Sequence, residues 1–181
     1  MKKIVLSVAL ICGVLHFLPA QNLPVDQGTG KITYLEVVDA AGVKPADLNK
    51  VVKDWATKQG FTNKEDAADK LVYDAFTNLD YPSVSGSGTE KGKVKFTLSV
   101  FLKDGKYRYI LTDFVHEGDV KTKANGGKLE NVNPDCGATK MSGKGWVTIK
   151  NKTGANMKAL TDDLKRVIKE YQNDPANKTD W

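Results

Sequence analysis

A predicted β-hairpin, residues 93–115, constrains the fold of this 181-residue chain more than any other stretch. Apolar and polar residues alternate along its first arm, which is the period-two pattern of a half-buried strand. Asp104-Gly105 then separates two such arms, and this dipeptide favours a two-residue type I′ turn. That turn predicts four facing pairs on one side of the hairpin: Leu102 with Tyr107, Val100 with Tyr109, Leu98 with Leu111, and Phe96 with Asp113. A face this apolar needs a helix packed against it.

The other face of the hairpin carries a mixture of aromatic, aliphatic and basic residues. The same register places Lys95, Phe101, Arg108, Ile110 and Phe114 on it. Exposed surface of this partly apolar kind often marks an interaction site on a soluble protein. These five residues are therefore the predicted interaction surface.

The first 20 residues have the pattern of an export signal peptide. Lys2 and Lys3 precede the apolar run Ile4–Leu18, and Leu18-Pro19-Ala20 fits a cleavage site. The run of about 15 residues is shorter than the roughly 20 that a membrane-spanning helix needs. Lipidation at Cys12 is the weaker alternative, because the residue before it is bulkier than usual at such sites. We expect export to the periplasm or the medium, without a transmembrane segment.

Cleavage after Ala20 predicts a single mature domain, residues 21–181, with a mixed surface charge. The chain has 27 Lys+Arg and 22 Asp+Glu; loss of two leader lysines leaves 25 against 22, a net charge of +3. Cys136 is the one cysteine that remains, so an intramolecular disulfide is excluded. A mature chain of about 160 residues can bury about 68–70% of its unfolded surface, which is enough for one self-sufficient domain.

Two helices are predicted from the helical spacing of apolar residues. The first begins at Pro45, because a proline is tolerated at the first helical position, and ends before Gly60. The second carries an apolar stripe from Met157 to Tyr171 and ends before Pro175. We expect both stripes to face the core.

The remaining segments predict strands and loops. Strands are expected at residues 31–38, 83–89 and 145–150. Residues 63–80 are ambiguous: their periodicity slightly favours a helix, and a strand at residues 70–77 is the alternative. Residues 117–144 are rich in glycine and asparagine and are predicted to form a long loop that is functional or mobile. Residues 174–181 are expected to fray.

Four ionisable residues lie within seven positions at the end of the hairpin: Asp113, His116, Glu117 and Asp119. Carboxylates and imidazole can bind a metal, but consecutive residues at a strand end point in different directions. Cys136 could form a nucleophile pair with His116, which requires hydrogen-bond reach and a lowered thiol pKa. We favour a solvated strand-to-loop transition and a surface thiol, and we predict no catalytic residue, no cofactor and no metal site.

Several short motifs between residues 22 and 116 follow one another in a characteristic order. They are Leu23-Pro24-Val25-Asp26, Gly30-Lys31-Ile32, Tyr34, Val37-Val38, Leu48, Trp55, Gly86-Ser87-Gly88 and Asp104-Gly105-Lys106-Tyr107-Arg108-Tyr109. Together they resemble an uncharacterised family of exported Bacteroidota proteins, described as a domain of unknown function with a TATA-binding-protein-like (TBP-like) fold. The resemblance implies the order β-α-β-β-β-β-α, and it favours a strand at residues 70–77. It implies no catalytic residues.

We therefore predict an α+β fold, an antiparallel sheet of four to six strands with two helices packed on one face. The predicted function is a non-enzymatic exported module that binds a protein, glycan or envelope component through the second hairpin face and the 117–144 loop. One alternative is a small-molecule carrier or hydrolase with a cleft between sheet and helices near His116. Another is a structural domain that dimerises through an edge strand, so the oligomeric state stays open. Nucleic acid is not expected as a partner, because the lysines are scattered among acids.

Overall fold

A computed structural model describes residues 23–177 of the chain. Its elements, in chain order, are β1 (Tyr34–Asp39), α1 (Pro45–Lys58), β2 (Thr62–Asp66), β3 (Lys70–Pro82), β4 (Thr89–Lys103), β5 (Lys106–Gly118), β6 (Gly127–Lys128), α2 (Gly143–Asn173) and the short 3₁₀ helix η1 (Pro175–Asn177). The predicted signal peptide and residues 178–181 of the predicted frayed tail lie outside the described residues.

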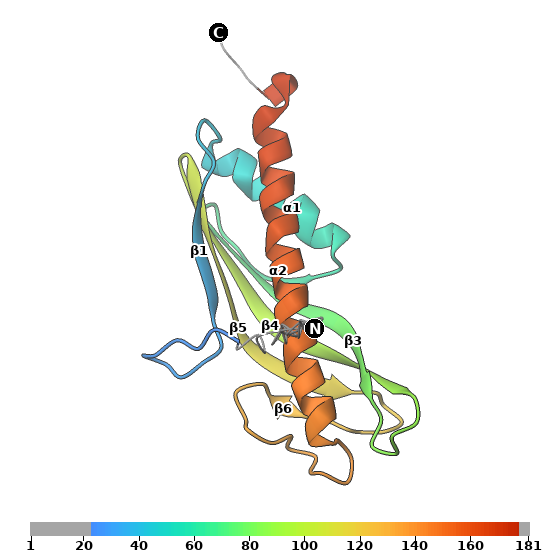
Figure 1. Cartoon of the computed structure of the whole chain (residues 1–181). Helices are drawn as coiled ribbons and strands as arrows, with labels where there is room; N and C mark the ends of the chain where they lie inside the picture. Colours follow the sequence, from blue (N-terminus) through green and yellow to red (C-terminus); the bar gives the residue numbers. More distant parts are fainter. Residues whose placement is uncertain (1–22, 178–181) are drawn as a thin grey trace, which may run out of the picture.

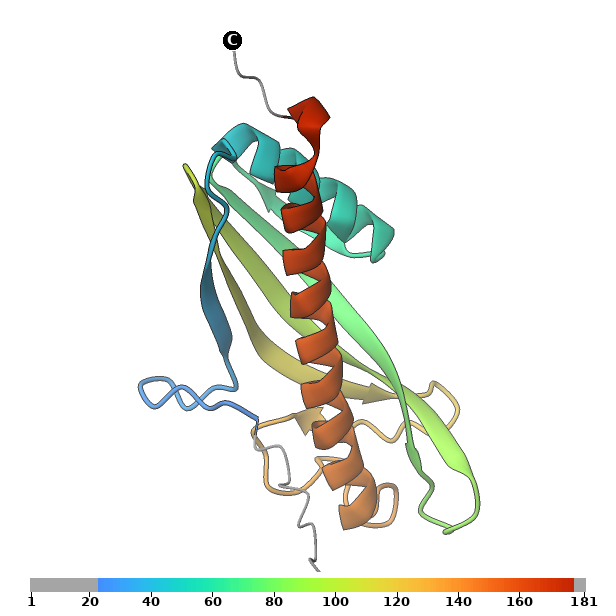
Figure 2. The same ribbon diagram turned by 45° about the horizontal axis from the view of Figure 1, so that its top comes forward.

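One antiparallel sheet contains all the strands named above. Its order is β1-β5-β4-β3-β2, and β6 pairs with β5 near the end of that strand. Both helices cover the same face, which we call the inner face: α2 runs along the sheet and α1 lies across its upper end (Figures 1 and 2). We call the opposite surface the open face. The predicted α+β architecture is confirmed.

The hairpin of β4 and β5 has the predicted register over its upper half. Leu102 pairs with Tyr107, and the next predicted pairs follow as far as Leu98 and Leu111. The turn differs from type I′, because only Gly105 has a positive φ, at 65°. A positive φ at the second central residue alone is the pattern of a type II turn. The Gly105 N–H donates to the Val43 carbonyl at 3.1 Å, which fixes the hairpin tip against the loop between β1 and α1.

A β-bulge ends the predicted register, so the pairing of Phe96 with Asp113 is wrong. Two residues of β5, Asp113 and Phe114, oppose Phe96 alone, and Asp113 adopts a φ of 59°. Each residue after the bulge therefore faces the side opposite to the predicted one. Phe114 and His116 point into the core, and both are 0% exposed. Asp113 is exposed and pairs with Lys31, with 2.6 Å between Nζ and Oδ1.

Helix α1 follows its predicted pattern closely. It begins at Pro45 and is followed by Gly60, whose φ of 73° ends the helix. Its apolar stripe is buried against the sheet and α2, and the Trp55 Nε1–H donates to Asp163 Oδ2 at 2.8 Å. Within residues 23–177, no helix combines the length and the apolarity that crossing a bilayer requires.

Helix α2 begins at Gly143, and the strand predicted at residues 145–150 is wrong. Ser142 caps the helix, because its hydroxyl oxygen accepts a hydrogen bond from a backbone N–H of the first turn. The β-branched residues of this segment favour a strand locally. Burial of Trp146 and Ile149 in line with the rest of the helical stripe favours the helix instead.

Residues 63–80 form β2 and β3 and not the helix that periodicity slightly favours. Along β3 the alternate residues Leu71, Tyr73 and Ala75 are buried. The strand that the family resemblance implied at residues 70–77 is thus confirmed. The strand predicted at 83–89 is wrong, since residues 83–88 are the turn before β4.

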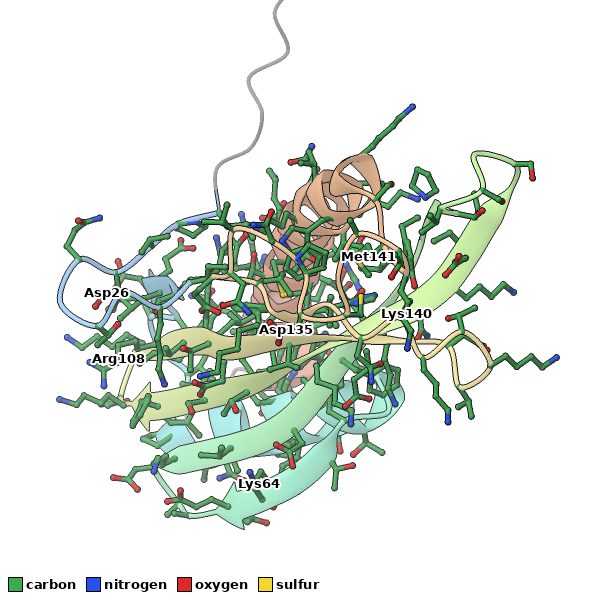
Figure 3. The ribbon with its side chains drawn as sticks, turned by 90° about the horizontal axis from the view of Figure 1, so that it is seen from below. Asp26, Lys64, Arg108, Asp135, Lys140 and Met141 are labelled. Carbon is green, nitrogen blue, oxygen red and sulfur yellow. The ribbon has the colours of Figure 1, made fainter. Side chains whose placement is uncertain are left out.

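The segment between β5 and α2 is shorter and better packed than the predicted 117–144 loop. Only residues 119–142 lie between the two elements, and they include β6. Ala124, Leu129 and Met141 are each 1% exposed and anchor the segment. Seen from this end of the molecule, Asp135, Lys140 and Met141 lie across the end of the sheet (Figure 3). The segment closes this end of the core.

Candidate functional site

The open face of the sheet carries apolar side chains that no described element covers. Two neighbouring rows of paired residues cross β1, β5, β4 and β3. One row is Leu35, Ile110, Ser99 and Val72, and the next is Val37, Arg108, Phe101 and Lys70. Leu35 and Val37 are each 57% exposed. Such a continuous, partly apolar surface differs from the scattered single apolar residues that are normal on a protein.

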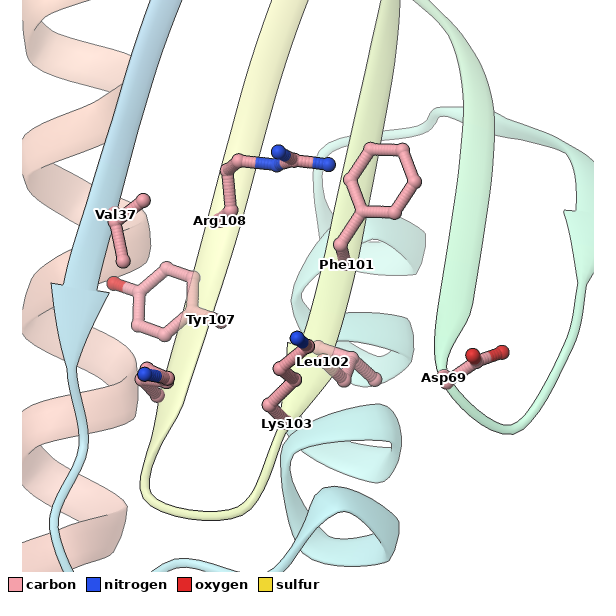
Figure 4. Close-up of a pocket in the computed structure, with 8 residues that line it drawn as sticks. Val37, Asp69, Phe101, Leu102, Lys103, Tyr107 and Arg108 are labelled. Atoms are coloured by element: carbon pink, nitrogen blue, oxygen red, sulfur yellow. The ribbon is translucent and has the colours of Figure 1, made fainter.

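A hollow of about 310 Å³ lies in this surface at the hairpin end of the sheet (Figure 4). It is lined by Val37, Asp69, Phe101, Leu102, Lys103, Lys106, Tyr107 and Arg108. The Arg108 guanidinium reaches toward the neighbouring strand and lies over the Phe101 ring, 4.5 Å from the guanidinium carbon to the ring centre. This stacking holds the charged group beside the hollow.

Basic side chains outnumber acidic ones around the hollow. Lys103, Lys106 and Arg108 line it together with one carboxylate, Asp69. Among the described residues, no acidic group lies within 4.0 Å of any of these three cations. The hollow therefore has a net positive charge that no carboxylate of the described residues neutralises within 4.0 Å.

The predicted interaction surface is partly brought together. Phe101, Arg108 and Ile110 lie on the open face as expected. Lys95 is on the same face farther along β4, where it pairs with Glu117 at 2.6 Å. Phe114 was predicted on this face, and that prediction is wrong because the bulge places the residue in the core.

Leu35 and Val37 belong to the site but were missing from the prediction. Apolar residues occur in both alternating sets of this strand, Tyr34 in one and Leu35 and Val37 in the other, which indicates that both of its faces are partly apolar. That signal does not say which strand lies beside it. The pairing of β1 with β5 places Leu35 next to Ile110 and Val37 next to Arg108.

His116 lies in the core, and the expectation of a solvated strand-to-loop transition is wrong for this residue. Its Nδ1 accepts a hydrogen bond from the Gly126 N–H at 3.1 Å. Its ring meets those of Tyr81 and Trp146 edge to face, at 5.2 and 6.2 Å between centres. Nδ1 is thus an acceptor, so Nε2 carries the proton, and Nε2 has no hydrogen-bond partner among the described residues.

Two kinds of chemical site were considered at this end of the hairpin, a metal site and a Cys136–His116 nucleophile pair, and the described residues assemble neither. Within residues 23–177, no group of three or more His, Cys, Asp or Glu side chains is placed to hold a metal ion. The Cys136 thiol is half-buried. It makes no hydrogen bond to His116, whose Nδ1 accepts from Gly126 and whose Nε2 has no partner among the described residues. Burial raises the pKa of Cys136, which disfavours the thiolate that a nucleophile requires.

Lowering the pH from 7.5 to 5.5 should reduce the free energy of unfolding by about 1.3 kcal/mol through His116. Burial lowers the pKa of His116 from 6.5 to about 4, because the charged ring loses its hydration. The unfolded chain then takes up a proton below pH 6.5 while the folded chain stays neutral, so stability falls with pH in this window. Urea unfolding at the two pH values measures the effect. The variant His116→Gln should lose this dependence, and an unchanged slope in the variant would contradict the assignment.

A family model described as a domain of unknown function (DUF4468) with TBP-like fold matches residues 34–117. These residues are a DUF4468 domain. The match covers β1 to β5 and α1, including all the strands that form the hollow of the open face.

Two solved structures share the fold of this chain. A TBP-like protein from Parabacteroides distasonis aligns with a TM-score of 0.57 at 16% identity, over 81% of this chain and 97% of its own. A DUF4468 family protein from Bacteroides ovatus aligns with a TM-score of 0.54 at 12% identity, over 89% of this chain and 95% of its own. At such identities the likeness establishes the fold alone. Comparison with curated proteins gives no match.

Proposed function

We propose that this chain is a non-enzymatic exported module that binds a partner through the open face of its DUF4468 domain. The observation that supports the proposal is the exposure of Leu35 and Val37 beside the hollow, on a sheet whose other face is covered by helices. An exposed apolar surface of this extent is stabilised when a partner covers it. The segment 119–142, also expected to take part, contributes no residue to the hollow.

The alternative of a carrier or hydrolase at His116 receives less support. Such a function requires an open cleft with convergent polar groups. His116 is 0% exposed and is enclosed by Tyr81 and Trp146. A substrate could reach the imidazole only if the packing of these rings opened.

A photo-crosslinking amino acid placed at Val37 in living host cells should form a covalent adduct with the partner. Val147 on α2 is a matched control, because it is also an exposed valine, at 54% against 57%, and does not lie on the open face. We expect a discrete adduct, seen by immunoblot and identified by mass spectrometry, from position 37 and not from position 147. The same adducts from both positions, or none from position 37, would contradict the proposed function.

A further inference from the structure

We infer that the hollow beside Val37 receives an acidic side chain from a partner protein whose flanking residues are apolar. The inference rests on the proposed binding function and specifies its ligand chemistry. Three features support it: the positive charge of the hollow, the two lysines that face each other across the hairpin, and the width of the surrounding surface.

The arrangement of Lys103 and Lys106 favours an anion between them. The two lysines are directly opposite each other across the hairpin, the last pair before the turn. Like charges facing each other on a sheet are destabilising. Asp39 is the β1 neighbour of Lys106 but forms no ion pair with it within 4.0 Å. A carboxylate in the hollow would relieve the repulsion that the chain leaves in place.

Arg108 supplies the directional contact for such a carboxylate. A guanidinium can stack on an aromatic ring and still present a flat edge of N–H donors to a carboxylate. Arg108 already lies over the Phe101 ring and forms no hydrogen bond to another described side chain. Its side chain is thus positioned before the ligand arrives, which reduces the entropy lost on binding.

Three cations farther along the open face are neutralised by described carboxylates. Glu117 pairs with Lys93 at 3.5 Å and with Lys95 at 2.6 Å, and Lys64 pairs with Asp74 at 3.2 Å. Lys91 and Lys128 also lie on this face without an ion pair within 4.0 Å among the described residues, but it is at the hairpin tip that three such cations line one hollow. An acidic group gains most by binding there.

The surface around the hollow favours a protein over a free anion or a lipid bilayer. Its apolar rows cross four strands, a width of about 14 Å at the usual strand spacing, which a small ion cannot cover. Glu65 and Asp74 project from the same side of the sheet. Each of them pairs with a lysine, Glu65 with Lys70 at 2.7 Å and Asp74 with Lys64 at 3.2 Å, so positive and negative charges alternate on this side. A protein partner can place its own charges to suit this alternation, whereas a uniformly anionic bilayer cannot.

The experiment compares a charge-reversed hollow with a charge-reversed control. The variant K103E/K106E replaces a facing pair of lysines by a facing pair of glutamates, so the repulsion across the hairpin is kept and the sign of the hollow changes. The control K140E/K144E makes the same change in net charge at the opposite end of the molecule, where both lysines are exposed. The probes are a synthetic peptide alternating glutamate with valine, the same peptide with glutamine, inorganic phosphate, and phosphatidylglycerol vesicles. Binding is followed by amide chemical shifts of the nitrogen-15-labelled protein.

We expect the glutamate peptide to shift the amides of residues 101–108, and K103E/K106E to weaken its binding by about tenfold or more. The control should bind within about twofold of the unaltered protein. K103E/K106E should also reduce the Val37 crosslink, while K140E/K144E should leave it unchanged.

Equal binding of the glutamine peptide, equal losses in both variants, or the same shifts with phosphate or vesicles would overturn the inference. A Val37 crosslink that is insensitive to K103E/K106E would overturn it too, while leaving the proposed function in place. Absence of any Val37 crosslink would instead remove the proposed function.

Discussion

Phe114→Ala should lower the free energy of unfolding by about 3–5 kcal/mol, the range for a large aromatic side chain removed from a core. Phe114 is 0% exposed. Its ring stacks on Phe96 at 5.4 Å between centres and meets Tyr34 edge to face at 5.8 Å. The substitution removes these contacts and leaves a cavity between β5 and its neighbours, which urea unfolding at pH 7.5 would detect.

Phe101→Ala is the matched control on the same hairpin. Phe101 is half-buried on the open face, and its described aromatic contacts are with the cations of Arg108 and Lys70. Loss of such exposed contacts costs about 0.5–1 kcal/mol each, so we expect a much smaller destabilisation than for Phe114→Ala. Similar losses for the two variants would show that the bulge does not separate the two rings onto opposite faces.

Gly126→Ala should destabilise the fold by about 1–3 kcal/mol, as expected when an atom is inserted into a packed core. A Cβ at this position would lie 2.3 Å from Cζ3 of Trp146. The indole cannot move away freely, because it is 2% exposed and its Nε1–H donates to the Asn131 carbonyl at 3.1 Å. Displacement of Gly126 would also strain its hydrogen bond to the His116 ring.

Gly143→Ala tests whether the effect comes from this contact. Gly143 opens α2, and a Cβ added there would meet nothing within 4 Å. Alanine is favoured over glycine in a helix by about 0.5–1 kcal/mol, so this variant should be neutral or slightly more stable. Thermal unfolding of both variants gives the comparison. A Gly126→Ala protein as stable as Gly143→Ala would mean that the base of the molecule repacks easily.

The fold could be predicted from the sequence wherever local pattern and tertiary packing agree. The hairpin register was predictable as far as Leu98 and Leu111, because alternation and the turn both specify it. Beyond Thr112 the bulge adds one residue, and alternation alone cannot reveal an insertion that leaves the pattern of the strand apparently intact. A polar residue such as Asp113 tolerates a positive φ better than most, but that tolerance is too weak a signal to locate a bulge.

Two segments show tertiary packing overriding local preference. Residues 70–77 contain apolar residues at helical spacing, namely Leu71, Val72, Ala75 and Phe76, yet pairing with β4 makes them a strand. Residues 145–150 contain β-branched residues, yet burial of Trp146 makes them helical. The family resemblance covers residues 22–116, so it includes the first segment and favoured the strand that the structure shows. It does not include residues 145–150, and it therefore gave no information on the second segment.

The candidate site was predictable in its centre and not at its edge. Phe101, Arg108 and Ile110 share a face by the hairpin register alone. Leu35 and Val37 join them only because β1 lies beside β5, and strand order depends on contacts between distant parts of the chain. Phe114 was assigned to the wrong face because the bulge reverses the facing of the residues that follow it.

The position of α2 in chain order has a consequence during synthesis. Every strand leaves the ribosome before this helix, so the inner face that Met157, Leu164 and Ile168 cover has no partner when β5 is complete. At about 5–20 residues per second, the stretch from Gly118 to Ile168 takes about 3–10 seconds to translate. A sheet assembled in that interval would present its apolar inner face to other nascent chains. The interval before the helix arrives is therefore the stage of synthesis at which this face is most exposed to aggregation.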